Sequence, residues 1–290
     1  MKPVFFSWWW HGHPARVLLM FCFFPAPAHA AFEEKPLSAR AASMGETGIG
    51  DADAPDAWLS NPAALGFLDR PQLTMSQTKV LGEASLPFSA LGVGLPASSG
   101  RSGLGAVASY FGDGPYHERE IGLSGAARAT PAAAVGASVN GSFLDMARYG
   151  GSSAWSVDAG VMGRPHPRVS LGFAVQRVNN PELAGIRNAL PSVTRAGAAE
   201  SVFQGARLTL DLVKPRALPF STRIGLELSP APAFFLRAGG ESRPGRYSFG
   251  FGIQTSFGRI DYAFLSHPFL GDQHQFSLTI FWGTRRPSQT

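Results

Sequence analysis

The sequence predicts an all-β protein: a transmembrane antiparallel β-barrel of about 14 strands with an N-terminal plug or hatch segment inside it. First, apolar residues alternate with small or polar residues in short runs from Gln72 to Trp282, which is the period of a strand. Second, the chain has 34 Gly, 23 Pro, 22 Phe and only 16% charged residues, a composition typical of a turn-rich β fold. Third, no apolar run after the first 30 residues reaches the roughly 18 residues of a transmembrane helix. A membrane-inserted chain of this kind must close into a barrel.

The first 30 residues have the layout of a signal peptide. Lys2 and Arg16 precede an apolar run from Val17 to Phe24, and residues 28–30 form an A-x-A cleavage site. We therefore expect the mature chain to begin near Ala31. An uncleaved anchor is the alternative, although the apolar run is too short to span a bilayer.

The position of the single cysteine and the distribution of charge narrow the class of protein further. The only cysteine, Cys22, lies in the predicted signal and follows Phe21, whereas a lipoprotein signal has a small residue there. We expect a mature protein without a thiol, disulfide or lipid anchor. The net charge of +5 is carried mostly by arginines scattered singly along the chain. Nucleic-acid binding needs such charges clustered on one face, so we expect no nucleic-acid partner.

The plug is predicted over residues 31–70, between the signal (1–30) and the barrel (71–283), with a tail at 284–290. Fourteen strands enclose more space than wall side chains can fill, so something must block the interior. Glycines that permit tight turns and an Asn-Pro step suit this segment. Its proposed motif residues are Gly45, Gly48, Asp51, Asp53, Asn61, Pro62 and Ala63. The plug is either a hatch that gates passage or a static filler with a helix beginning at Pro62.

Regular alternation predicts the strands. We expect 14 of them, an even number as in bacterial barrels, centred near residues 75, 90, 106, 124, 137, 159, 173, 195, 209, 224, 236, 250, 262 and 278. A soluble β-sandwich is the alternative, because its strands alternate too. The last run is the clearest, and we interpret its apolar face as the signal that the barrel-assembly machinery reads. That face consists of Phe276, Leu278, Ile280 and Trp282.

Loop lengths predict two different barrel ends, because bacterial barrels alternate short periplasmic turns with longer external loops. We expect tight turns at Thr130–Pro131, Ser229–Pro232 and Gly258. We expect external loops at residues 111–118, 144–154, 179–190 and 266–273.

No motif indicates a metal, a cofactor or an enzyme. Asp51, Asp53 and Asp56 lack the further ligands of an EF-hand loop, and we expect them to be solvated or paired with arginine. The histidines at 117, 166, 267 and 274 lack ligand spacing. The glycine-rich run at 103–108 reads as a strand rather than a dinucleotide loop, and there is no G-x-S-x-G nucleophile elbow.

Two segments resemble one protein family. Residues 61–65, Asn-Pro-Ala-Ala-Leu, resemble the Asn-Pro-Ala-Gly-Leu element of the FadL-like outer-membrane proteins, with Ala64 in place of glycine. Residues 260–282 are similar to the closing hairpin of the PorV/PorQ group within that superfamily. The matching residues are Asp261, Tyr262, Ala263, Phe264, Leu270, Gly271, His274, Phe276, Ser277 and Leu278. The Gly-Asp before the leucine and the Arg after the histidine of that pattern are absent. The tail after Trp282 also departs from the family, whose chains usually end on an aromatic residue.

The resemblance implies a non-enzymatic bacterial outer-membrane barrel that acts in protein secretion or envelope assembly, with a partner surface at its extracellular rim. The alternative is FadL-like transport of small hydrophobic molecules, which predicts an apolar pocket between plug and wall. A purely structural barrel is a third possibility. The expected partners are outer-membrane lipid, the barrel-assembly machinery, and either secretion or envelope proteins or a hydrophobic ligand.

Overall fold

The computed structural model describes residues 32, 35–80, 86–97, 100–186, 189–216, 218–266, 268 and 271–285. The predicted signal peptide, its cleavage near Ala31, Cys22 and His267 lie outside these residues. No helix in the described part of the chain is both long enough and apolar enough to cross a membrane.

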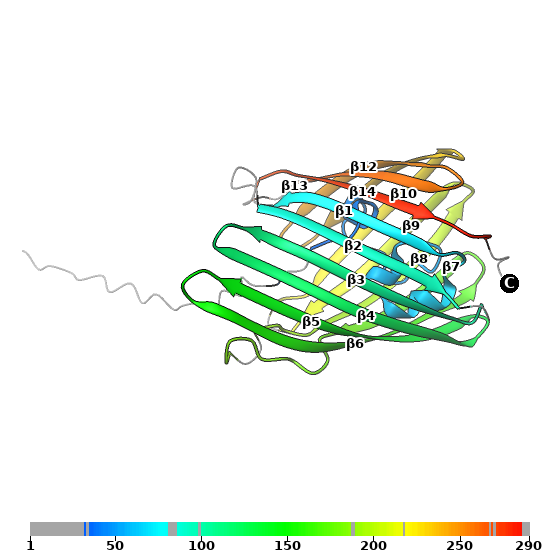
Figure 1. The fold of residues 1–290 in the computed structure, drawn as a ribbon. Helices are drawn as coiled ribbons and strands as arrows, with labels where there is room; N and C mark the ends of the chain where they lie inside the picture. The colour runs from blue at the N-terminus through cyan, green and yellow to red at the C-terminus, as the bar shows by residue number, and fades with distance from the viewer. Residues whose placement is uncertain are drawn as a thin grey trace, which may run out of the picture. The chain divides into compact units, whose positions relative to one another are not determined.

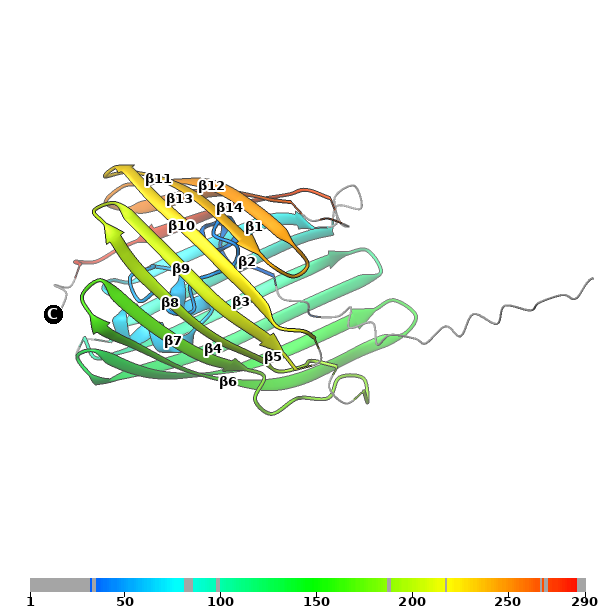
Figure 2. The same cartoon turned by 180° about the vertical axis from the view of Figure 1, so that it is seen from behind.

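Fourteen antiparallel strands close into a barrel, as predicted (Figures 1 and 2). Each strand pairs with its sequence neighbours, and β1 also pairs with β14, with Leu73 opposite Ile280. Every predicted strand centre falls inside an observed strand. The strands are β1 (Gln72–Val80), β2 (Leu86–Pro96), β3 (Ser102–Asp113), β4 (Tyr116–Thr130), β5 (Ala133–Met146), β6 (Gly150–His166), β7 (Val169–Gln176), β8 (Val193–Phe203), β9 (Ala206–Pro215), β10 (Ser221–Ala231), β11 (Phe234–Glu241), β12 (Arg246–Gln254), β13 (Gly258–Ser266) and β14 (Gln273–Phe281).

The apolar face of each strand points out of the barrel. In β9, Leu208, Leu210 and Leu212 are exposed, whereas Thr209 and Asp211 are buried. A sandwich would bury the leucines between two sheets, so the closed ring excludes that alternative. The exposed apolar band is the surface that membrane lipid covers in an outer-membrane barrel.

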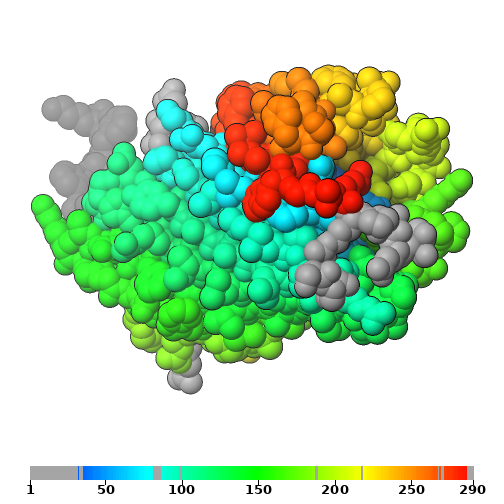
Figure 3. All heavy atoms as spheres, turned by 45° about the vertical axis from the view of Figure 1, so that its right-hand side comes forward, coloured from blue at the N-terminus to red at the C-terminus, as the bar shows by residue number. Residues whose placement is uncertain are grey.

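The closing strand follows the same rule. Phe276, Leu278 and Ile280 point outward, and their neighbours Gln275, Ser277 and Thr279 are buried. Trp282 lies one residue beyond the end of β14. Its backbone N–H donates to the carbonyl of Pro71 at 3.2 Å. In Figure 3 the C-terminal residues (red) lie against those of the first strands (cyan) on the outer surface.

The two barrel ends differ, but less than predicted. At the end where β1 begins, the turns after β4, β6, β8 and β10 have two residues each. At the other end, the connection from β7 to β8 spans 177–192. The prediction of external loops at 111–118 and 144–154 is wrong, because most of these residues belong to the strands of the hairpins β3–β4 and β5–β6.

The physical reason lies in the turns. Gly114 (φ 56°) and Arg148 (φ 73°) adopt the left-handed conformation that a tight turn needs. The strands therefore keep their ladder hydrogen bonds almost to the tip. Because bacterial barrels carry their short turns on the inside, we refer to the end where β1 begins as the periplasmic end and to the other as the extracellular end.

Residues 35–70 form the plug inside the barrel (Figures 1 and 2). It contains helix α1 (Ala39–Ser43) and two 3-10 helices, η1 (Ala57–Leu59) and η2 (Pro62–Phe67). Its main apolar cluster packs Trp58, Leu65 and Phe67 against wall residues that include Ala134 and Met162. The hydrophobic core of this protein thus lies between plug and wall. Many large apolar side chains of the wall face outward, but Met162, Phe88 and Phe111 are among those that are buried.

Candidate channel and its plug

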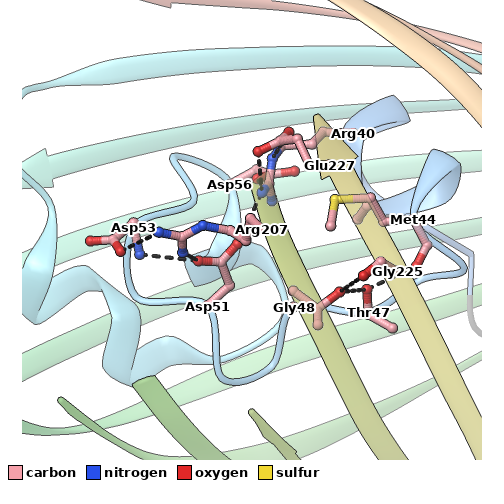
Figure 4. Close-up of polar contacts among 12 residues, drawn as sticks. Arg40, Met44, Thr47, Gly48, Asp51, Asp53, Asp56, Arg207, Gly225 and Glu227 are labelled. Carbon is pink, nitrogen blue, oxygen red and sulfur yellow. Dashed lines mark hydrogen bonds and ion pairs between the residues drawn. The ribbon is translucent and has the colours of Figure 1, made fainter. Parts of the chain in front are cut away.

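Helix α1 places Arg40 inside the lumen, against β10. Ser38 caps the helix by accepting the N–H of Ala41 at 3.1 Å, so the first turn is fixed. The Arg40 guanidinium donates to both carboxylate oxygens of Glu227 on β10, at 3.1 and 3.2 Å (Figure 4). It also pairs with Asp51 at 2.9 Å and Asp56 at 3.3 Å. One buried cation therefore ties two parts of the plug to the wall.

Burial alone would lower the pKa of Arg40, but the charges of these three carboxylates outweigh it and raise the pKa above its ordinary value. The guanidinium is therefore charged at every pH at which the protein works.

The predicted motif residues Asp51 and Asp53 form a second link. Both pair with Arg207 on β9 (Figure 4), and Asp53 also pairs with Arg164 on β6 at 2.5 Å. Burial would raise the pKa of Asp53, but the charges of Arg207 and Arg164 lower it below its ordinary value. The expectation of arginine-paired carboxylates is confirmed for all three aspartates.

A third ion cluster holds the plug against β10, β11 and β12. Glu46 pairs with Arg223 at 3.2 Å and with Arg246 at 3.1 Å, and both arginines also pair with Glu241. Glu46 itself adopts a positive φ of 60°. This conformation costs energy in a non-glycine residue, and the two ion pairs offset that cost.

The glycines of the motif let the plug backbone turn and meet the wall. Gly45 has φ 70°, and its N–H donates to Ser248 at 3.0 Å. Gly48 has φ 123°, and the N–H groups of Gly48 and Ile49 both donate to one oxygen of Asp211 on β9, at 2.9 and 3.1 Å. A side chain at Gly45 would overlap the backbone of Gly240.

Asn61 organises the later half of the plug. Its side-chain oxygen accepts the N–H of Ala63 at 3.1 Å, and Pro62 begins η2, as predicted for a helix starting at this step. Its amide donates to the carbonyl of Ile49 at 2.9 Å and to that of Val161 on β6 at 3.2 Å. One fully buried side chain thus joins the helix start, the preceding turn and the wall.

The wall meets the plug through inward-facing glycines, a feature that sequence reasoning missed. A Cβ at Gly172 would overlap the carbonyl oxygen of Ile49, and one at Gly239 would overlap the N–H of Gly45. Gly225 lies beside Met44 and Thr47 (Figure 4). The signal is present in the sequence, since these glycines occupy the inward positions of alternating strands, but only the register places them beneath the plug. The wall glycines approached by plug backbone are Gly103, Gly136, Gly172, Gly225 and Gly239.

Two cavities lie on opposite sides of the plug. The extracellular cavity has a volume of about 170 Å³, with Phe32, Leu37 and Phe111 among its apolar lining. The periplasmic cavity has a volume of about 1220 Å³ and a lining rich in arginine. Trp58 is the one residue, among those described, that lines both cavities.

The histidines do not gather at the site. His117 bonds to the hydroxyl of Tyr110 at 2.5 Å, His274 bonds to Tyr262 at 2.7 Å, and His166 is exposed at the periplasmic end. Within the described ranges, no group of three or more His, Cys, Asp or Glu residues is arranged to hold a metal ion.

Comparison with known proteins identifies the fold. No protein-family model and no curated protein matches the chain. Among solved structures, it is similar to the CymD monoaromatic hydrocarbon channel (TM-score 0.64, 14% identity, 86% of this chain and 98% of that one). It is also similar to the toluene transporter TbuX of Ralstonia pickettii (0.61, 13%, 86% and 98%) and to a FadL homologue of Pseudomonas aeruginosa (0.58, 14%, 86% and 98%). The chain therefore has the 14-strand barrel fold of the FadL-type outer-membrane proteins, and its apolar exterior belongs in the outer membrane.

Proposed function

We propose that this protein is a non-enzymatic channel that lets small, largely apolar molecules cross the outer membrane, and that the plug closes it in the state described. The observation that carries the proposal is the pair of cavities on either side of the plug, separated at Trp58. The structural neighbours named as hydrocarbon channel and toluene transporter support this reading over the secretion reading.

The extracellular cavity suits a small aromatic molecule. A cavity of about 150 Å³ holds benzene in an engineered protein, and this one has about 170 Å³. Its lining is amphipathic rather than apolar as we expected. Phe88 and Phe111 are among the apolar residues, Ser138 and Asn140 among the polar ones, and Glu118, Glu120, Asp158 and Arg177 among the charged ones. This mixture favours a ligand with one polar edge over a saturated hydrocarbon.

Trp58 is the residue most suited to open the route. Its ring lies on a patch of wall without side chains, formed by Gly92, Gly94 and Gly105. Its indole N–H is buried and has no hydrogen-bond partner among the described residues. An unpaired buried donor costs roughly 1–3 kcal/mol, so a rotation that brings this N–H to water recovers part of the cost of moving the ring. The ion pairs that hold the rest of the plug remain in place.

The predicted motif residues take a role in this proposal. Gly45, Gly48, Asp51, Asp53, Asn61, Pro62 and Ala63 would anchor the plug while Trp58 moves. The outward residues Phe276, Leu278, Ile280 and Trp282 remain our proposed assembly signal.

Trp58→Ala tests the proposal in proteoliposomes. We expect faster entry of toluene than in the wild type, because the truncation joins the two cavities. Trp155→Ala is the matched control, since Trp155 faces outward on β6 and is 57% exposed. Unchanged entry in a correctly folded Trp58→Ala variant would contradict the proposed route.

The secretion or envelope-assembly reading depends on a partner surface at the extracellular rim. Two of the segments expected to build that surface, 111–118 and 144–154, are mostly strand, and their hairpins end in short turns. The reading thereby loses much of its proposed surface, so we place it second.

A further inference from the structure

The periplasmic cavity carries more positive than negative charge. Among the described residues that line it, seven are arginines and three are carboxylates. A saturated hydrocarbon gains little from such a lining, and a neutral aromatic ring gains only cation–π contact. Arg40, Arg207 and Arg259 also pair with carboxylates outside this lining, namely Asp51, Asp56 and Asp261. The positive charge that points to an anionic ligand is therefore that of the remaining arginines.

Two of these arginines lack a carboxylate partner. Within the described part of the chain, neither Arg128 nor Arg70 forms an ion pair, although Arg285 and Arg164, also in the lining, do. Arg128 on β4 donates through Nε to the carbonyl of Gly66 at 2.7 Å, and Arg70 donates to the carbonyl of Ser256 at 3.1 Å. Arg128 therefore keeps guanidinium N–H groups that no carboxylate in the described part of the chain binds, whereas the charge of Asp69 acts on Arg70.

Arg128 and Arg164 converge on one aromatic ring. Their guanidinium carbons lie 4.8 and 4.9 Å from the ring centroid of Phe67, so the two groups are at most 9.7 Å apart, the sum of these distances. Arg164 already shares Asp53 with Arg207, which leaves its charge only partly compensated. The two cations repel each other at such a separation, and of the two only Arg164 has a carboxylate partner among the described residues.

We propose that Arg128 and Arg164 form a binding site for the carboxylate of a small aromatic acid, with benzoate as the simplest member of the class. A guanidinium fork matches the geometry of a carboxylate and can bind it through two hydrogen bonds. The apolar body of the ligand would lie against Phe67 and Leu68, which line the same cavity. The inference deepens the proposed channel function by naming the class of molecule that its inner end holds.

Equilibrium binding to the purified full-length protein in detergent, measured by calorimetry, tests the site. We expect benzoate to bind the wild type and benzamide, its neutral analogue, to bind at least tenfold more weakly. Arg128→Gln should weaken benzoate binding by about tenfold or more, the effect of losing one charge-assisted hydrogen bond. Arg128→Lys should retain part of the affinity, and high salt should weaken binding to the wild type.

Arg119→Gln is the matched control, because Arg119 lies on the same strand but is exposed on its outward face near the extracellular end. Heat-dependent migration in gel electrophoresis checks that each variant is folded. Equal affinity for benzoate and benzamide, equal binding by Arg128→Gln and the wild type, or tighter binding of inorganic phosphate than of benzoate would overturn the proposal.

The two proposals fail separately. Benzoate binding does not require passage, so loss of the Trp58 effect on toluene entry would leave the carboxylate site standing. Absence of benzoate binding would leave the toluene route standing.

Discussion

At the scale of single residues, Arg40 joins more parts of the molecule than any other side chain that we describe in the plug. It neutralises Asp51 and Asp56 in the plug and Glu227 in the wall. All four side chains are at most 12% exposed. Without the guanidinium, Asp51 would keep Arg207, and Glu227 would keep Arg237 and Arg259. Asp56 would lose its one ion pair among the described residues, which would leave a buried carboxylate without a cation.

We therefore expect Arg40→Met to lower the free energy of unfolding by about 3–5 kcal/mol, the usual result of removing one partner from a buried ion pair. Urea unfolding in lipid vesicles measures it. Arg285→Ala is the control, because Arg285 pairs with Asp69 at the surface with its side chain 74% exposed, and such pairs contribute at most about 1 kcal/mol. Similar losses for both variants would show that the central cluster does not hold the plug.

The pKa of Asp53 predicts the acid limit of the closed state. Burial would raise this pKa, but Arg207 and Arg164 lower it below the ordinary value of 3.8. A group with a lowered folded pKa stabilises the fold above its unfolded pKa and loses that effect as the pH falls through the folded value. We expect the Asp53 contacts to persist at pH 5 and to weaken only below about pH 3.8.

Conductance of single channels in planar bilayers between pH 3 and pH 7 measures this limit. The wild type should open more often below pH 3.8, and Asp53→Asn should show the more open behaviour at neutral pH with a smaller further change in acid. If Asp53→Asn opens in acid as much as the wild type does, protonation of Asp53 is not the cause of the opening.

At the scale of elements, the strands are predictable because their signal is local. Each alternating run contains its own two faces, as Leu208 and Thr209 show in β9. The contacts of the plug are not local. Whether Gly172 lies beneath Ile49 depends on the register of β7 in the ring and on the path of the plug, and neither can be read from nearby residues.

The same reasoning explains what sequence analysis found and missed at the site. The pairing of Asp51 with arginine could be expected from chemistry, since a carboxylate inside a lumen needs a cation. Which arginines pair with Asp51 could not be predicted from the sequence. Arg207, for example, is 156 residues away in the chain. Trp58 belongs to no sequence motif that we recognised, and its role follows only from its position between the two cavities.

Gly172→Ala should displace the plug while leaving the barrel closed. The added methyl group would overlap the carbonyl oxygen of Ile49, and overpacking of this kind typically costs about 1–3 kcal/mol. We expect greater protease access to the plug and a higher channel conductance. Gly125→Ala is the control, because a Cβ there would make only an ordinary contact at 3.5 Å with Leu104. Equal behaviour of the two variants would mean that the plug adjusts without loosening.

At the scale of the whole molecule, the function depends on which end of the barrel faces out. The periplasmic end contains the two-residue turns, the start of β1 and the end of β14, and the arginine-rich cavity opens there. The extracellular end contains the connection at 177–192 and the smaller cavity lined by Phe111. A molecule entering from outside would therefore meet the amphipathic cavity first, then Trp58, and last the cationic cavity, where an anionic group would be held before release.

Cysteine labelling in intact cells tests this orientation. The only native cysteine, Cys22, lies in the segment that we expect to be removed, so an introduced cysteine reports alone. Tyr149→Cys, in the turn between β5 and β6 where Tyr149 is 86% exposed, should react with a membrane-impermeant maleimide. Ala132→Cys, in the turn between β4 and β5, should react only after the outer membrane is permeabilised. The reverse pattern would invert the barrel and make the arginine-rich cavity the entrance, which would turn the proposed holding site into a site that selects anions from outside.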